Sequence, residues 1–509
     1  MTNTFTIPAP KTGPAPFPIP TDLWIGGQWV EAASKKRVDV FDPSTGKKLT
    51  DVADCDASDA LAAVDAADKA AAAWAATTPR HRAEVLRKCY EKIVENSEWL
   101  AYLISLENGK ALPDARAEVL YAAEFYRWYA EECCHVLGEI ALAPASGARI
   151  LVQYQPMGIA LLITPWNYPA AMATRKIAPA LAAGCTVVLK PATETPLTAF
   201  AVAQIMHDCG VPAGVVNVVT TGKASPLSKA VLHDPRVRKI SFTGSTPVGR
   251  ALLHEAADQV ISCAMELGGN APFIVCKDAN LNEALDGAML AKMRNSGEAC
   301  TAANRFYVHK DLYKGFTDGI VKRMSEIKLG DAVDPESTLG PMVNEKAVAK
   351  IGELVDDAVA KGAKLLLGGQ RLNRPGFYYP PTVLADVPDN ADMIREEIFG
   401  PVVSLQSFED EPILGDLYSI VWMRHRAFCH THIHCDNDIN ASSSDRNCHG
   451  HEHSHHHSNI YGFAHPHRHM GQTGTGQCDC ADPALPLDRS ISFRRAKLHK
   501  SILCKTREI

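Results

Sequence analysis

Between residues 158 and 243 the chain repeats one pattern, in which a short apolar run is followed by a longer stretch with the composition of a helix. The apolar runs are GIALLIT (158–164), CTVVLK (185–190), VVNVVT (215–220) and RKISFT (238–243). Apolar strands that alternate with helices are typical of a parallel sheet covered by helices on both faces. The pattern therefore predicts an α/β fold.

The regions on either side extend this prediction to two α/β domains. Residues 59–77 are rich in alanine, with acidic residues near their start, which predicts a helix. A second series of strand-like runs comprises APFIVC (271–276), KLLLGG (364–369) and YYPPTVL (378–384). We place a first domain at residues 21–262 and a second at residues 263–411.

Composition and charge exclude several classes of protein. The net charge of −6 argues against nucleic-acid binding, and no uncharged apolar run is long enough to span a membrane. Residues 1–20 are rich in proline and lack a secretory signal pattern, so we expect a flexible leader on a cytoplasmic protein. The 15 cysteines do not suggest a disulfide framework in so long a chain.

The character of the chain changes near residue 411. Residues 412–509 contain 14 of the 20 histidines and 6 of the 15 cysteines, including HGHEHSHHH at 449–457. One interpretation is a metal-binding extension, and the other is a segment without a designed fold, such as a shifted reading frame. The irregular spacing favours the second interpretation, so we assign no metal ligands.

Four short stretches carry residues suited to chemistry. They are TPWNYP (164–169) with Asn167, FTGSTPVGR (242–250), MELGGN (265–270) with Glu266, and NSGEACTAANR (295–305) with Cys300. A buried structural cysteine usually has large apolar neighbours, whereas the small residues around Cys300 leave room for a reactant. A helix that starts near Pro247, after a glycine-rich turn, would offer free N–H groups to a phosphate.

This set of motifs, in this order, resembles the aldehyde dehydrogenase superfamily. The resemblance runs from LWIGGQWV (23–30) to EEIFGP (396–401). It implies a Rossmann-type cofactor domain at 21–262 with an oligomerisation hairpin near 140–156, a catalytic domain at 263–411, and a homo-oligomer. After SFEDE (407–411) the family continues with further elements that nothing here resembles, which implies an incomplete or aberrant C-terminal part.

The catalytic residues make chemical sense in that family. A thiolate at Cys300 can attack an aldehyde carbonyl, and the Asn167 amide with the Cys300 main-chain N–H can stabilise the oxyanion. Hydride transfer to a nicotinamide then leaves a thioester, and Glu266 can act as the general base for its hydrolysis. Glu298 stands where the family often has glutamine, and we expect its side chain to point away from Cys300.

The resemblance also assigns residues to the cofactor, with NADP favoured and NAD possible. At Thr193 many members that prefer NAD carry a glutamate, which would repel a 2′-phosphate, whereas a threonine hydroxyl would not. The residues that the resemblance assigns to the cofactor are Trp166, Lys190, Thr193, Gly244, Ser245 and Glu397.

Two arginines indicate the substrate. Arg175 and Arg294 match arginines that bind the substrate carboxylate in succinate-semialdehyde dehydrogenases, and a guanidinium fork suits a carboxylate. We therefore expect oxidation of succinate semialdehyde, a small-molecule aldehyde, to succinate. Two alternatives stay open: an aldehyde dehydrogenase for another aldehyde, and an inactive chain whose histidine-rich end binds metal.

Overall fold

The computed structural model describes residues 3–7, 18–409 and 421–423. The rest of the predicted tail at 412–509, with its histidine-rich run, lies outside the described residues. The helices of the described part, including the short 3₁₀ turns, are α1 (Ala57–Ala75), α2 (Pro79–Glu95), α3 (Ser97–Asn108), α4 (Leu112–Glu132), η1 (Cys133–His135), α5 (Pro169–Ala182), α6 (Pro196–Asp208), α7 (Ala224–Leu232), α8 (Thr246–Ala257), α9 (Leu281–Met293), η2 (Arg294–Gly297), α10 (Lys310–Ser325), α11 (Glu345–Ala360) and η3 (Asp392–Ile394).

The larger sheet of the described chain has seven strands in the order β13-β12-β9-β10-β11-β3-β4. The four strands predicted between residues 158 and 243 are confirmed, and they pair in parallel. The strands of this sheet are β3 (Leu23–Ile25), β4 (Gln28–Val30), β9 (Ile159–Ile163), β10 (Thr186–Lys190), β11 (Val216–Val218), β12 (Val237–Gly244) and β13 (Ser262–Leu267).

The order of the parallel strands is that of a Rossmann sheet. Counted from β9, the chain first moves outward through β10 to β11 and then returns to the other side of β9 for β12 and β13. The carboxyl ends of β9 and β12 therefore flank a topological switch point, where ligands bind in open α/β sheets.

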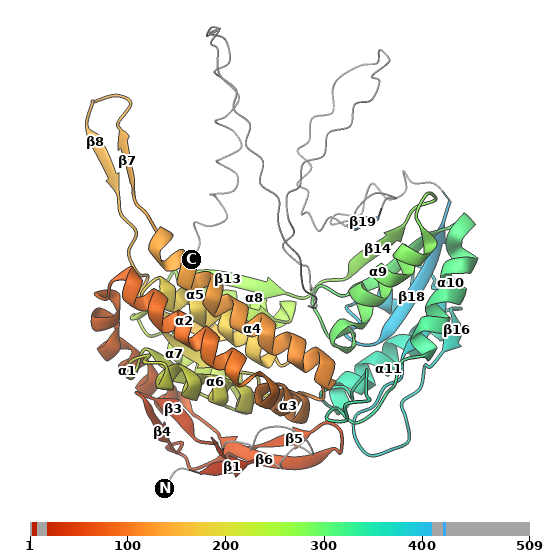
Figure 1. Ribbon diagram of the computed structural model, residues 1–509, viewed down its shortest axis with the longest axis horizontal. Coiled ribbons are helices and arrows are strands. Elements are labelled where there is room, and N and C mark those ends of the chain that lie inside the picture. Colours follow the sequence, from red (N-terminus) through yellow and green to blue (C-terminus); the bar gives the residue numbers. More distant parts are fainter. Residues whose placement is uncertain (1–2, 8–17, 410–420, 424–509) are drawn as a thin grey trace, which may run out of the picture. The chain divides into compact units, whose positions relative to one another are not determined.

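Both faces of this sheet are buried, as the apolar runs predicted. Along β9, Ala160 and Leu162 pack with the helices α2 to α6, whereas Leu161 and Ile163 pack with α1, α7 and α8. Figure 1 shows these helices around the strands. Since successive side chains of a strand point to opposite faces, a strand between two helical layers needs apolar residues at every position.

The second sheet has the order β16-β17-β18-β15-β14-β19 in the described residues, and β14 to β18 confirm a second α/β region. Helices α9 and α10 cover one face, and α11 packs on the other. Strand β19, in the region of the predicted tail, pairs in parallel with β14. The strands of this sheet are β14 (Ala271–Val275), β15 (Ala303–His309), β16 (Lys364–Leu367), β17 (Thr382–Ala385), β18 (Val402–Phe408) and β19 (Val421–Met423).

Two strand pairings of the structure extend across segments that the sequence analysis separated. Strand β13 crosses the predicted boundary at residue 262 and pairs along its length with β12, so residues 263–267 belong to the first sheet. Part of the predicted flexible leader is ordered, because β1 (Thr4–Thr6) pairs with β2 (Pro18–Pro20). The apolar side chains of Ile7 and Ile19 are buried there, and the many prolines had hidden this packing.

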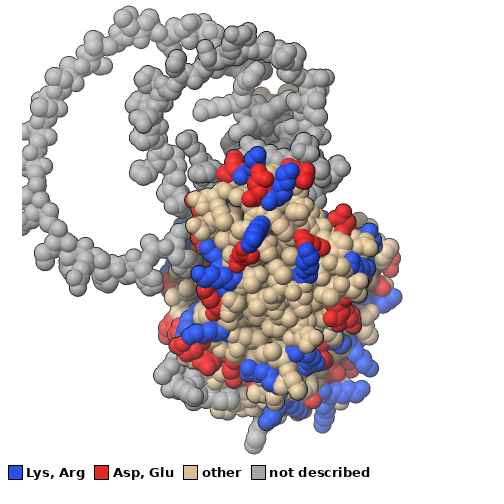
Figure 2. Space-filling model, turned by 90° about the vertical axis from the view of Figure 1, so that its right-hand side faces the viewer, with Lys and Arg blue, Asp and Glu red and all other residues tan. Residues whose placement is uncertain are grey.

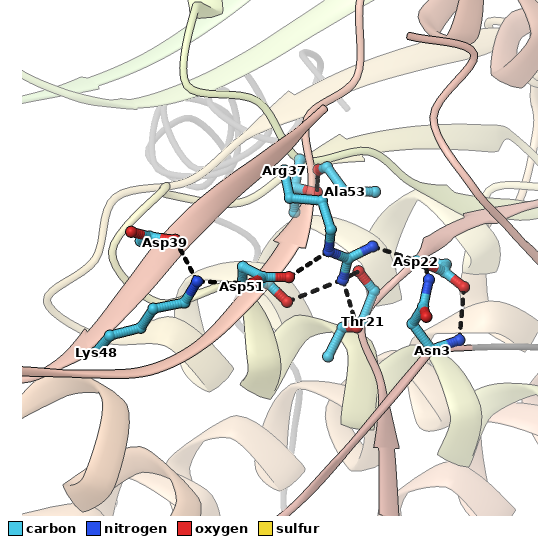
Figure 3. Close-up of polar contacts among 9 residues, drawn as sticks. Asn3, Thr21, Asp22, Arg37, Asp39, Lys48, Asp51 and Ala53 are labelled. Atoms are coloured by element: carbon cyan, nitrogen blue, oxygen red, sulfur yellow. Dashed lines mark hydrogen bonds and ion pairs between the residues drawn. The ribbon is translucent and has the colours of Figure 1, made fainter. Parts of the chain in front are cut away.

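A polar network fastens this N-terminal part to the hairpin of β5 (Arg37–Asp42) and β6 (Lys47–Ala53). The Arg37 guanidinium contacts Asp22 at 3.0 Å and also binds Asp51, while Lys48 bridges Asp51 and Asp39 (Figure 3). The main-chain N–H of Asn3 donates to Asp22 at 2.9 Å, so the same network reaches β1.

A second hairpin, β7 (Glu139–Leu142) with β8 (Arg149–Val152), lies in the predicted oligomerisation segment near 140–156. All residues of both strands are exposed, and Figure 1 shows the hairpin extending away from the neighbouring helices. Several of its exposed side chains are large and apolar, with Ile140 at 79% and Leu151 at 72% exposure.

The charged side chains and the composition of the helices bear on the class of protein. Figure 2 shows acidic and basic side chains interspersed over the face that it presents. Among the described residues, no helix is both long enough and apolar enough to cross a membrane.

Candidate active site

Four of the predicted catalytic and cofactor residues lie at the carboxyl ends of parallel strands in the first sheet. Asn167 follows β9, Lys190 ends β10, Gly244 ends β12, and Glu266 is the next-to-last residue of β13. These are the positions at which the switch point of the first sheet places ligand-binding groups.

Cys300 lies in the turn between η2 and β15, and the residue as a whole is exposed. Burial of the thiol is the largest cause that raises the pKa of Cys300, and the negative charges of Glu397 and Glu266 raise it further, whereas Arg175 lowers it. The structure thus brings the predicted nucleophile, base and one substrate arginine together. A thiol with a raised pKa needs a proton acceptor before it can attack a carbonyl, and Glu266 is the exposed carboxylate beside it.

The turn that leads into Cys300 has an unusual backbone. Asn295, Ser296 and Gly297 all have left-handed conformations, with φ of 54°, 57° and 74°. Each non-glycine residue in this region costs on the order of 1–2 kcal/mol. At Gly297 only glycine fits, because a Cβ there would lie 2.3 Å from the carbonyl oxygen of Gly400.

Asn167 is 5% exposed, and its side-chain amide is hydrogen-bonded to the segment that carries the nucleophile. Its Nδ2 donates to the main-chain carbonyl of Glu298 at 2.8 Å. A side-chain amide carries two N–H groups, so one remains for a substrate oxyanion. The role of Asn167 as oxyanion donor stays a prediction, and this contact fixes the orientation of the amide that the role requires.

A buried ion pair lies behind Asn167, and the sequence analysis missed it. The Lys110 Nζ donates to the Asn167 main-chain carbonyl at 2.9 Å and pairs with Glu118. Glu118 also accepts from the main-chain N–H groups of Ala170 and Ala171, at the start of α5. No local signal could have found these contacts, because Lys110 and Asn167 are 57 positions apart in the chain.

Glu298, two residues before the nucleophile, is 2% exposed. Burial raises its pKa to about 8, which the Lys110 charge and a hydrogen bond from the Val343 main-chain N–H partly offset. The carboxyl group is therefore mostly protonated at neutral pH. The side chain of Glu298 extends toward the charge of Lys110 and the main-chain N–H of Val343.

Lys176 is another buried group beside the site that the sequence analysis did not single out. Burial lowers its pKa to about 7, helped by Arg175 and opposed by the Glu266 charge. Its Nζ donates to the Ser241 hydroxyl at 2.9 Å, which ties α5 to β12.

The residues at the proposed cofactor site fit a nicotinamide dinucleotide. Oε1 of Glu397 is buried without a hydrogen-bond partner among the described residues, and so could accept from a ligand hydroxyl. A Cβ at Gly268 would lie 2.5 Å from Oε2 of Glu397, so only glycine leaves this carboxylate in place. Helix α8 begins after Ser245, which makes no side-chain cap, so its first N–H groups can meet a phosphate.

Trp166, Lys190 and Thr193 border the same end of the sheet. The Trp166 ring packs edge-on against Phe399 with a centroid distance of 5.3 Å. Burial lowers the pKa of Lys190, whose Nζ donates to the Pro191 carbonyl at 3.1 Å. The Thr193 hydroxyl donates to the Thr221 carbonyl at 2.9 Å.

The two predicted substrate arginines both lie near the nucleophile. Arg175, on α5, has its guanidinium 5.7 Å from the centre of the Phe125 ring, and its charge acts on Cys300. Arg294 is exposed, and its Nη2 donates to the hydroxyl of Thr301 at 3.3 Å, next to the nucleophile. Their positive charges can therefore meet an anionic group that enters toward the thiol.

In the part of the chain that the structure describes, no cluster of three or more His, Cys, Asp or Glu side chains is placed to hold a metal ion. The predicted metal-binding alternative concerns residues outside that part.

Comparison with known proteins identifies the family. The model of the aldehyde dehydrogenase family matches residues 29–413. The chain is 51% identical to succinate-semialdehyde dehydrogenase of Paenarthrobacter nicotinovorans over 363 residues, 71% of this chain and 81% of that protein. It is 45% identical to the NADP(+) succinate-semialdehyde dehydrogenase of Escherichia coli K12, over 76% of this chain and 80% of the relative.

A crystal structure of an NADP-dependent enzyme from E. coli matches with a TM-score of 0.76 and 44% identity, over 78% of this chain and 82% of that one. The family match ends close to residue 411, where the sequence analysis expected the resemblance to stop. The family model, the relatives and the similar fold show that this chain belongs to the aldehyde dehydrogenase family.

Proposed function

We propose that the protein oxidises succinate semialdehyde to succinate, with NADP as the hydride acceptor, through a thioester on Cys300. The observation that carries the proposal is that two arginines, Arg175 and Arg294, lie beside the nucleophile in a family that oxidises aldehydes. Succinate semialdehyde has an aldehyde at one end for Cys300 and a carboxylate at the other end for the guanidinium groups.

In the first half of the reaction, Glu266 accepts the Cys300 proton and the sulfur attacks the aldehyde carbon. The free N–H of the Asn167 amide and the main-chain N–H of Cys300 stabilise the resulting oxyanion. The bound cofactor supplies the acceptor for the hydride that leaves this carbon, and a thioester remains on Cys300.

Before the second half, Glu266, which is an exposed residue, releases the Cys300 proton to solvent. It then takes a proton from water, and the hydroxide attacks the thioester carbonyl. The carbon–sulfur bond breaks, and succinate and the Cys300 sulfur are released. Glu397, Gly244, Ser245, Lys190, Thr193 and Trp166 are the residues that would hold the dinucleotide. NADP is favoured over NAD because Thr193 carries no charge to repel a 2′-phosphate.

Self-association through the β7–β8 hairpin belongs to the same proposal. The exposed apolar side chains of Ile140, Leu142 and Leu151 support it, because monomers rarely leave so many large apolar groups together in water. Location in the cytoplasm remains a prediction.

The test compares succinate semialdehyde with butyraldehyde, which has the same number of carbons but no carboxylate. Each charge-assisted hydrogen bond contributes about 1.5–3 kcal/mol, so kcat/KM should favour the semialdehyde by about 10²-fold or more. Arg175→Ala and Arg294→Ala should each lose most of that preference and leave butyraldehyde rates nearly unchanged.

Arg127→Ala is the matched control, because the Arg127 guanidinium also lies 5.7 Å from the centre of an aromatic ring, that of Tyr90, but Arg127 is on α4 rather than α5. It should keep the preference of the wild type. A wild-type protein that oxidises both aldehydes equally well would refute the semialdehyde assignment and leave the choice of aldehyde open.

A further inference from the structure

Two main-chain carbonyls near the nucleophile are bridged by a single side chain. Nδ2 of Asn295 donates to the Asn167 carbonyl at 3.0 Å and to the Glu298 carbonyl at 2.8 Å. One carbonyl belongs to the residue that follows β9, and the other lies two residues before Cys300. Asn295 thus connects the segment of the oxyanion donor to the segment of the nucleophile.

Both carbonyls have a second donor, which fixes them completely. The Asn167 carbonyl also accepts from Lys110, and the Glu298 carbonyl also accepts from Nδ2 of Asn167. A carbonyl oxygen has two lone pairs, so neither atom has capacity to spare. If Asn295 releases its two bonds, both the backbone of Asn167 and the acceptor that orients its side chain lose a restraint.

Asn295 itself is anchored from another helix. Its main-chain N–H donates to the carboxylate of Asp114 on α4 at 3.0 Å, and the residue is 2% exposed. Asparagine is also one of the few residue types that tolerate the left-handed backbone at this position. The residue type, its anchor and both of its acceptors suit a fixed bridge.

We propose that Asn295 is a positioning residue that aligns the Asn167 amide with Cys300 for oxyanion stabilisation. The inference rests on the proposed function only for the identity of the reacting carbonyl, since any acyl group that Cys300 attacks forms an oxyanion at the same place. Because Asn295 acts through Asn167, its loss cannot cost more of this stabilisation than the loss of the Asn167 amide.

The experiment measures two reactions of Cys300 in the full-length chain. p-Nitrophenyl acetate acylates the thiol through an oxyanion and requires no cofactor. Iodoacetamide alkylates the same thiol by direct displacement, in which no oxyanion forms. Peptide mass spectrometry should follow Cys300 in both reactions, because the chain has 15 cysteines.

Asn295→Asp keeps the shape of the side chain and its tolerance of the backbone but replaces the donor with an acceptor that faces two carbonyls. We expect acylation of Cys300 to slow by about 10- to 100-fold, below the limit for loss of an oxyanion donor, and alkylation to keep its wild-type rate. Asn295→Gly, which removes the donor without this repulsion, should slow acylation less and serves if the aspartate variant does not fold.

The matched control is Asn217→Asp. Asn217 is also a fully buried asparagine whose Nδ2 donates to two main-chain carbonyls, those of Val187 and Gly214, but it lies in β11. Its aspartate variant should lower the melting temperature as the Asn295 variant does and leave the ratio of acylation to alkylation unchanged.

A double variant with Asn167→Ala tests whether Asn295 acts through Asn167 or stabilises the site independently of it. If Asn295 acts through Asn167, adding Asn295→Gly to Asn167→Ala should slow acylation no further. Additive losses, or equal losses in acylation and alkylation, would overturn the inference.

Semialdehyde turnover of the wild type is measured in parallel. If it is absent while the ester still acylates Cys300, the proposed function fails and the role of Asn295 is still tested. If the ester does not acylate wild-type Cys300, the inference about Asn295 fails as well, since there is no oxyanion to stabilise.

Discussion

The groups that react and the groups that hold them differ sharply in their surroundings. Cys300 and Glu266 are exposed residues at the mouth of the site. Asn167, Asn295 and Glu298 lie at 5%, 2% and 2% exposure, and hydrogen bonds join all three. The first region is open to solvent. In the second, the side chains are held by hydrogen bonds, although Oδ1 of Asn167 and Oε1 of Glu298 are buried without a hydrogen-bond partner among the described residues.

This difference suggests two kinds of sensitivity. A group at the mouth acts by exchanging protons or bonds, so its replacement should stop a step outright. Asn167, Asn295 and Glu298 form what we call the buried frame. A group in this frame acts through geometry and its own ionisation, so its replacement should lower rates or stability only in part. Substitutions in each region can break or sharpen that distinction.

The largest effect should come from the mouth of the site. Cys300→Ala should abolish aldehyde oxidation, because no thioester can form. Glu266→Gln should slow the attack of the thiol, for which other bases can accept the proton, and stall deacylation more, giving a slowed burst of reduced cofactor followed by little turnover. Stopped-flow absorbance of the reduced nicotinamide at 340 nm measures both phases.

Cys276→Ala is a control for the loss of a thiol, because Cys276 is a buried cysteine at the end of β14. It should keep turnover, even though it opens a small cavity. Full turnover by Cys300→Ala, or a Glu266→Gln variant with neither a burst nor any loss of rate, would contradict the assignment of roles.

The sequence predicted the fold better than the frame of the site. Strands β9 to β12 were visible because a strand buried on both faces must be apolar throughout, a property of local composition. Cys300, Asn167 and Glu266 were visible because their motifs match those of a known family. Contacts such as Lys110 with Asn167 were invisible, because the fold brings together residues that the sequence separates.

Helix starts show the same limit. Helix α6 is capped by Glu107, whose carboxylate accepts from the main-chain N–H groups of Leu197 and Thr198 about 90 positions away. A local rule looks for the capping residue at the helix itself, where Thr195 makes no cap. The sequence therefore predicts that a helix starts here, but not which residue stabilises its start.

A smaller effect is expected at the cofactor end, where Thr193 is also held by a hydrogen bond. Thr193→Glu should place a carboxylate near the 2′-phosphate and lower the ratio of kcat/KM for NADP to that for NAD by about 10-fold or more. Steady-state kinetics with both cofactors measure the ratio. The neighbouring variant Glu194→Gln should leave it unchanged, since Glu194 faces Asn344. An unchanged ratio in Thr193→Glu would place Thr193 away from the phosphate.

The smallest effect should come from ionisation within the buried frame. In the unfolded chain Glu298 should titrate near its usual pKa of about 4.3, whereas burial raises its pKa in the folded protein to about 8. Between these values the folded state keeps a proton that the unfolded chain has released, so this group makes stability fall as pH rises from about 5 to 8. Glu298→Gln removes that titration and keeps the main-chain carbonyl that orients Asn167.

The variant should therefore melt near the wild type at pH 5 and about 2–5 °C above it at pH 8, as scanning calorimetry at one fixed scan rate can measure. Turnover at pH 7 should persist, because the carbonyl that accepts from Asn167 and Asn295 is unchanged. Glu353→Gln, at an exposed position on α11, should show no such difference between the two pH values. If the difference in melting temperature between Glu298→Gln and the wild type were the same at both pH values, the pKa of Glu298 would not be raised by folding. The buried frame would then act through geometry alone.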